Sequence, residues 1–69
     1  MQDARIRLNG EDAPLAATVT ALLQDREIDP EQRGVAVAVN GAVVPRAVWR
    51  TTQLRPGDRV EIVRARQGG

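Results

Sequence analysis

Apolar and polar residues alternate near both ends of the chain, and this alternation predicts two strands. Ile6 and Leu8 alternate with arginines over residues 4–8, and Val60 and Ile62 fall on one face of residues 59–65. A period of two residues is typical of a strand with one buried face. We expect these two strands to lie side by side as the inner pair of a small sheet.

Asn9-Gly10 directly follows the first strand and predicts a hairpin turn. Both central residues of such a turn need positive φ, which Asn and Gly tolerate better than other residues. The returning strand, within residues 11–17, contains Pro14. Because proline cannot donate a hydrogen bond to a neighbouring strand, we expect this strand to be short or at an edge.

A second Asn-Gly pair, Asn40-Gly41, follows the valine-rich segment 35–39. Valines on one face and small alanines on the other indicate a strand inside the sheet. The turn predicts a short partner strand over residues 43–44. We expect residues 46–54 to be irregular or to form a single helical turn, and residues 55–58 to form the turn before the last strand.

One amphipathic helix is predicted between the first hairpin and the valine-rich strand. Thr18 is a candidate N-cap residue, and Val19, Leu22 and Leu23 recur at helical spacing. The helix should end near residues 26–27, before the polar loop 29–34. The order of elements predicts an α+β fold, with one helix packed on one face of a small mixed sheet.

The composition argues against an enzyme. The chain has 69 residues, enough for one domain and too few for both a large core and an enclosed active site. It contains no Cys, His, Lys or Ser, so the usual nucleophiles and the usual neutral-pH base are absent. We therefore predict a protein without catalytic residues and without a metal site.

The charge pattern excludes further classes. Ten arginines are interleaved with nine acidic residues, giving a net charge of +1. This pattern is not typical of a nucleic-acid-binding surface, which clusters positive charge. No apolar run is long enough to span a membrane, and the first residues do not resemble a signal peptide. We expect a cytoplasmic protein that binds neither nucleic acid nor membrane.

A candidate surface for a protein partner lies on the outer face of the first and last strands. Arg5, Arg7 and Arg59 should form a small basic patch there if these strands are adjacent. Val63 points away from Val60 and Ile62, so we expect it to be exposed among these arginines. Trp49, the one aromatic residue, is either a structural anchor over the core or part of a partner surface.

The sequence ends in Gly68-Gly69, directly after the last predicted strand. We interpret residues 1–65 as the folded domain and residues 66–69 as a flexible tail that reaches at most about 13 Å. Glycines can pass through a narrow channel, and Gly69 offers an unhindered carboxylate that adenylation by ATP would activate. A frayed terminus is the alternative interpretation.

The chain resembles the ThiS family, the ubiquitin-like sulfur carrier proteins of thiamine biosynthesis. The resemblance covers nearly the whole sequence and is weakest over residues 11–17 and 24–33. The matching segments are Ile6-Arg7-Leu8-Asn9-Gly10-Glu11, Thr18-Val19 with Leu22-Leu23, Val37-Ala38-Val39-Asn40-Gly41, Val43-Val44-Pro45-Arg46, Trp49, Leu54-Arg55-Pro56-Gly57-Asp58-Arg59-Val60-Glu61-Ile62-Val63 and Gln67-Gly68-Gly69.

This resemblance implies a β-grasp fold and a carrier function. An E1-like, ThiF-type enzyme that uses ATP and Mg²⁺ would adenylate Gly69, with Gln67, Gly68 and Gly69 threaded into its active site. Sulfur drawn from cysteine through a persulfide donor would then displace AMP and leave a thiocarboxylate. A ThiG-type thiazole synthase would accept this sulfur, and the carrier itself would bind no cofactor.

Two alternatives remain open from the sequence. The small subunit of molybdopterin synthase has the same fold and thiocarboxylate chemistry but another sulfur acceptor. The chain could also be a β-grasp binding module that carries no sulfur and whose terminal glycines are incidental.

Overall fold

The computed structural model describes residues 4–65 of the chain. The strands differ from the sequence prediction only at their ends: the second stops at Pro14, the fourth covers residues 42–43, and the last stops at Arg64. The elements are, in order, β1 (Arg5–Leu8), β2 (Glu11–Pro14), α1 (Val19–Asp25), β3 (Val35–Val39), β4 (Ala42–Val43), the 3-10 helix η1 (Arg46–Val48) and β5 (Arg59–Arg64).

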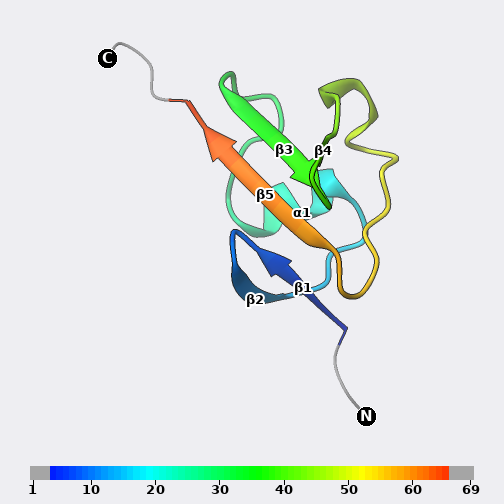
Figure 1. Ribbon diagram of the computed structural model, residues 1–69. Helices are drawn as coiled ribbons and strands as arrows, with labels where there is room; N and C mark the ends of the chain where they lie inside the picture. The colour runs from blue at the N-terminus through cyan, green and yellow to red at the C-terminus, as the bar shows by residue number, and fades with distance from the viewer. Residues whose placement is uncertain (1–3, 66–69) are drawn as a thin grey trace.

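The five strands form one mixed sheet in the order β2-β1-β5-β3-β4 (Figure 1). β1 and β5 are parallel, with Arg7 opposite Arg59, and every other neighbouring pair is antiparallel. The prediction that the first and last strands form the inner pair is therefore confirmed. β5 lies at the centre of the sheet and has a neighbour on each side.

Both predicted Asn-Gly turns are present. Asn9 and Gly10 have φ values of 50° and 83°, and Asn40 and Gly41 have values of 53° and 86°. These are the left-handed conformations that a tight hairpin turn requires. Local turn chemistry thus explains both hairpins, β1–β2 and β3–β4.

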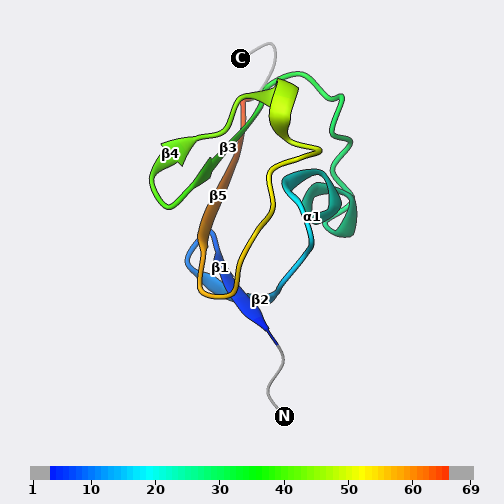
Figure 2. The ribbon, with the colours of Figure 1, turned by 90° about the vertical axis from the view of Figure 1, so that its right-hand side faces the viewer.

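The helix α1 begins at its predicted cap. The hydroxyl of Thr18 accepts a hydrogen bond of 3.1 Å from the backbone N–H of Ala21, which satisfies one free donor of the first turn. The apolar stripe Val19, Leu22 and Leu23 is buried against the sheet. Figure 2 shows that α1 lies on one side of the sheet, whereas no helix or strand of the described chain covers the other side.

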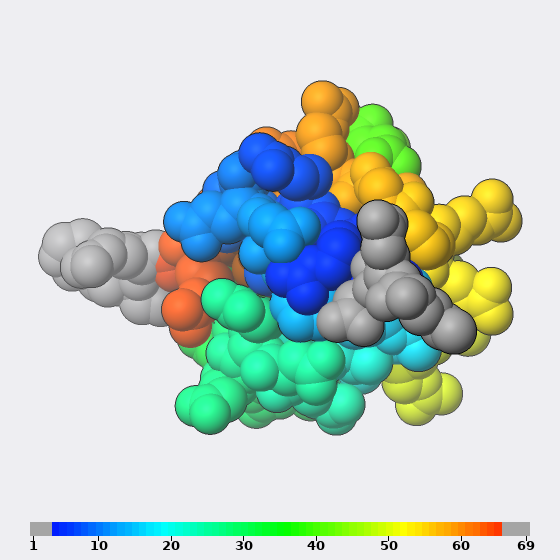
Figure 3. Space-filling model, turned by 90° about the horizontal axis from the view of Figure 1, so that it is seen from below, coloured from blue at the N-terminus to red at the C-terminus, as the bar shows by residue number. Residues whose placement is uncertain are grey.

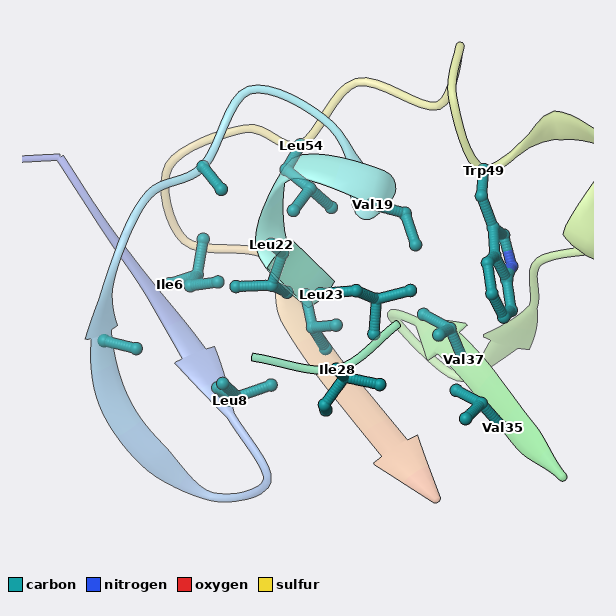
Figure 4. Packing of buried hydrophobic residues seen from close by; sticks show 13 residues of the cluster. Ile6, Leu8, Val19, Leu22, Leu23, Ile28, Val35, Val37, Trp49 and Leu54 are labelled. Carbon is teal, nitrogen blue, oxygen red and sulfur yellow. The ribbon is translucent and has the colours of Figure 1, made fainter. Parts of the chain in front are cut away.

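The hydrophobic core lies between α1 and the sheet (Figure 4). Trp49 closes one end of it and is only 3% exposed. Its indole Nε1 donates a hydrogen bond of 2.8 Å to the carbonyl oxygen of Val44. Trp49 is therefore the structural anchor, and the alternative of a partner-binding tryptophan is wrong.

None of the helices in the described part of the chain has the length and apolarity needed to cross a membrane.

Candidate functional site

The carboxyl end of β5 is the part of the fold that leads to the predicted reactive tail. Gln67, Gly68 and Gly69 lie outside the described residues, so their assigned roles stay predictions. The described chain ends just after β5, where the backbone N–H of Ala65 donates a hydrogen bond of 2.7 Å to the carbonyl oxygen of Gly34. The structure therefore fixes the strand that precedes the tail.

Gly34 lies close to this end of the chain because it has no side chain. Its φ is +81°, and a Cβ atom at this position would lie 3.2 Å from the carbonyl oxygen of Ala65. A larger residue would be strained in φ and would crowd Ala65. Glycine thus allows the loop before β3 to hold the chain where β5 ends.

Two asparagine side chains hold the backbone of β5. The side chain of Asn9 accepts a hydrogen bond of 2.8 Å from the N–H of Ile62 and donates one of 3.3 Å to its carbonyl oxygen. Asn40 accepts a hydrogen bond of 2.9 Å from the N–H of Arg59 and donates one of 3.0 Å to the carboxylate of Asp58. Each hairpin turn therefore also fixes the central strand.

The sequence predicts these asparagines only as turn residues. Their second role depends on which strand lies beside each turn, and Asn9 and Ile62 are 53 positions apart. No local pattern in the sequence shows such a contact. The placement of β5 beside both turns was needed to find it.

Val63 is 61% exposed, and the prediction of exposure is confirmed. Because side chains alternate along β5 and Val60 is buried in the core, Val63 lies on the face of the sheet that α1 does not cover. The residues around Val63 are not the expected arginines. Its partner across the strands is Ala36, and Val43, which is 75% exposed, lies on the next strand. Ala36, Ala38, Val43 and Val63 line a shallow hollow of about 190 Å³ together with Val37 and Glu61, and we call these four outward-facing apolar residues the apolar patch.

The expected arginine surroundings of Val63 are wrong because of strand order. β5 has β1 on one side and β3 on the other. The arginines belong to β1 and to the start of β5, whereas the outward positions beside Val63 belong to β3 and carry alanines. The sequence alone does not show which strand pairs with the first half of β5 and which with the second half.

The predicted basic patch forms beside the apolar patch. Arg7 and Arg59 are opposite each other on β1 and β5 and line a hollow of about 360 Å³ together with Glu61. Arg5 forms an ion pair with Asp12, at 2.6 Å between Nη2 and Oδ2. Hydrogen bonding from Arg5 lowers the pKa of the Asp12 carboxyl below its usual value. The positive charge of this surface is thus partly balanced by Asp12 and Glu61.

Four acidic residues, Asp25, Glu27, Asp29 and Glu31, lie at the end of α1 and in the loop that follows it. Within residues 4–65, no group of three or more carboxylates is close enough together to hold a metal ion. Asp29 instead accepts a hydrogen bond of 2.9 Å from the backbone N–H of Glu31 and shapes the loop.

Comparison with known proteins identifies the family of this chain and solved structures with a similar fold. The model of the ThiS family matches residues 4–69. The crystal structure of the thiamine biosynthesis protein (ThiS) from Geobacter metallireducens superposes with a TM-score of 0.77 at 28% sequence identity, covering 94% of this chain and 99% of that one. A comparison with curated proteins gave no significant match. The mixed five-stranded sheet with one helix is the β-grasp fold, and the chain belongs to the ThiS family.

Proposed function

We propose that this chain is a sulfur carrier whose Gly69 carboxylate is adenylated and then converted to a thiocarboxylate. The observation that carries this proposal is the family match, which extends through Gly68-Gly69. The similar structure is a thiamine biosynthesis protein, and this supports thiazole formation as the fate of the sulfur.

The chemistry would be divided between the chain and its partners. A carboxylate oxygen of Gly69 would attack the α-phosphate of ATP on a ThiF-type enzyme, which supplies the Mg²⁺ site, and pyrophosphate would leave. The terminal sulfur of a cysteine-derived persulfide would displace AMP and form an acyl disulfide with the chain. A second thiol supplied by the partner proteins would attack the donor's sulfur, forming a new disulfide and releasing the thiocarboxylate, whose sulfur a ThiG-type synthase would accept. The chain has no Cys, His, Lys or Ser, which supports the function of a co-substrate rather than an enzyme.

The uncovered face of the sheet is the surface that we propose for docking. It combines the apolar patch with the arginines Arg5, Arg7 and Arg59, and both lie on or beside the strand that leads to the tail. An apolar centre with a polar rim is typical of a specific protein interface. A partner bound here could receive Gln67, Gly68 and Gly69 in its active site.

Mass spectrometry of the intact chain tests the proposal. After incubation with ATP, Mg²⁺, the cognate adenylating enzyme and a sulfide source, we expect a mass gain of about 16 Da, from exchange of one oxygen for sulfur. Deletion of Gly69 should abolish the gain, and Gly68→Val should reduce it because a β-branched side chain hinders threading. A mass gain in the chain lacking Gly69 would refute the proposal. To test the proposed sulfur acceptor, the thiocarboxylate form is incubated with thiazole synthase, and we expect its mass to return to that of the unmodified chain.

A further inference from the structure

A second surface feature lies at the carboxyl end of β5, on the side of the sheet that faces α1. It is a cavity of about 230 Å³, which we call the two-arginine cavity, lined by Leu8, Asn9, Arg26, Ile28, Ile62 and Arg64. Figure 3 shows the three segments that form it, the blue β1–β2 hairpin, the blue-green segment after α1 and the red-orange end of β5, meeting at one side of the molecule.

The two arginines of this cavity have no partner within residues 4–65. The side chains of Arg5, Arg7 and Arg46 donate hydrogen bonds to Asp12 or to carbonyl oxygens. By contrast, neither guanidinium of the cavity makes a hydrogen bond or ion pair with another described residue. Asp25 and Glu27 flank Arg26 in sequence but form no ion pair with it.

The floor of the cavity is apolar and its backbone is fixed. Leu8 and Ile28 are buried, each 7% exposed. The N–H of Ile28 donates a hydrogen bond of 2.8 Å to the carbonyl oxygen of Leu23, and Asn9 holds Ile62 through two hydrogen bonds. The two guanidiniums therefore extend from fixed positions at the edge of one small space.

This arrangement suits a carboxylate. A guanidinium presents several N–H donors in a planar fork that matches the two oxygens of a carboxylate, and such charge-assisted hydrogen bonds are among the strongest in proteins. In the hollow beside Arg7 and Arg59, Glu61 already supplies a negative charge. Among residues 4–65, those that line the two-arginine cavity include no acidic residue, so the described part of the chain leaves its two positive charges available to an anion.

We propose that the two-arginine cavity binds a carboxylate side chain of the adenylating enzyme and thereby positions the tail. This inference rests on the proposed function. Arg64 is the last residue of β5, so an enzyme that takes up the tail must contact this end of the strand. The tail can carry Gly69 up to about 13 Å beyond the folded domain, so the ATP that activates Gly69 would lie at the far end of the tail, whereas the cavity at its base would meet the body of the enzyme. We therefore assign the anion to a side chain of the enzyme.

Steady-state kinetics of ATP–pyrophosphate exchange test this inference on the full chain. We expect Arg26→Gln and Arg64→Gln each to raise the KM for the carrier about five- to tenfold with kcat unchanged within about twofold, because the lost bonds are made on docking. Arg64→Lys, which keeps the charge, should recover part of the loss. Added salt should raise the KM of the wild type more than that of the variants.

Arg55→Gln is the matched control, because Arg55 is an exposed arginine in the turn before β5 and lies outside the cavity. Thermal unfolding checks that every variant is folded. If the wild type is adenylated and both cavity variants keep the KM of Arg55→Gln, the inference is overturned and the proposed function stands. If the wild type is not adenylated, both are overturned. A fall in kcat with an unchanged KM also contradicts a docking role.

Discussion

At the scale of single residues, Trp49 connects several segments that have no regular structure. The Arg46 guanidinium lies over its ring, 4.5 Å from the centroid, and also donates hydrogen bonds to the carbonyl oxygens of Pro30 and Gln32. The indole N–H bonds to Val44, just after β4. One side chain thus fills the end of the core and, through Arg46, holds the loop before β3.

Two substitutions of Trp49 should separate the contribution of its hydrogen bond to Val44 from that of its buried volume. Trp49→Phe keeps much of the buried volume but leaves the Val44 carbonyl without its donor, and we expect a loss of about 1–2 kcal/mol in unfolding free energy. Trp49→Ala also leaves a cavity and should cost about 3–5 kcal/mol, a large part of the stability of a small domain. Urea denaturation measures both.

Val48→Ala is the control for the Trp49 variants. Val48 is 42% exposed in the adjacent 3-10 helix, so its truncation should change stability by about 0.5 kcal/mol or less. If Trp49→Ala and Val48→Ala lowered the unfolding free energy equally, Trp49 would not anchor the core.

At the scale of elements, β5 is held unevenly by its neighbours. β3 pairs with it from Val60 to Arg64, whereas β1 pairs only with Arg59 and Val60. Beyond that point the side chain of Asn9 takes the place of a strand and bonds to Ile62. The half of β5 that leads to the tail therefore depends on a side chain for its second row of hydrogen bonds.

Hydrogen exchange at single amides tests whether the Asn9 side chain protects the backbone of β5 where β1 no longer pairs with it. Asn9→Gly keeps the positive φ that the turn needs but removes both hydrogen bonds, and we expect a loss of about 1–2 kcal/mol and faster exchange at the Ile62 amide. Asn40→Gly is the matched change in the other turn and should expose the Arg59 amide instead. Unchanged protection of Ile62 in Asn9→Gly would contradict the role assigned to Asn9.

The elements were predictable because their signals are local. Alternation, the Thr18 cap and the Asn-Gly turns each act over a few residues, and all appear where expected. The clamps of Asn9 and Asn40, the alanines beside Val63 and the pairing of Arg26 with Arg64 in one cavity join residues that are distant in sequence. Strand order creates these contacts, so only the folded arrangement could reveal them. The reactive role of Gly69 stays a prediction.

At the scale of the whole molecule, the two faces of the sheet differ. One face is buried under α1 (Figure 2), and the other carries the apolar patch together with Arg5, Arg7 and Arg59. Exposed apolar residues grouped on one face, with charged residues around them, mark an interaction surface more often than scattered ones do. The arrangement supports recognition through the uncovered face.

Val63→Asp tests recognition through the apolar patch. Because Val63 is 61% exposed, the variant should keep its unfolding free energy within about 1 kcal/mol. A buried charge in the interface should raise the KM for adenylation about tenfold or more. Val48→Asp places the same charge on an exposed valine of the 3-10 helix and should leave the KM unchanged. A folded Val63→Asp variant with the wild-type KM would place docking elsewhere.

The parallel pairing of β1 with β5 also has a consequence during synthesis. Until β5 has been made, β1 has only β2 as a neighbour, and an isolated two-stranded hairpin is marginally stable. The centre of the sheet can close only when the last strand of the described chain is present, since that strand lies between the two hairpins. A prematurely terminated chain therefore cannot assemble the sheet and remains a substrate for proteases. Only chains synthesised at least as far as β5 can therefore form the sheet and present the face that we propose for docking.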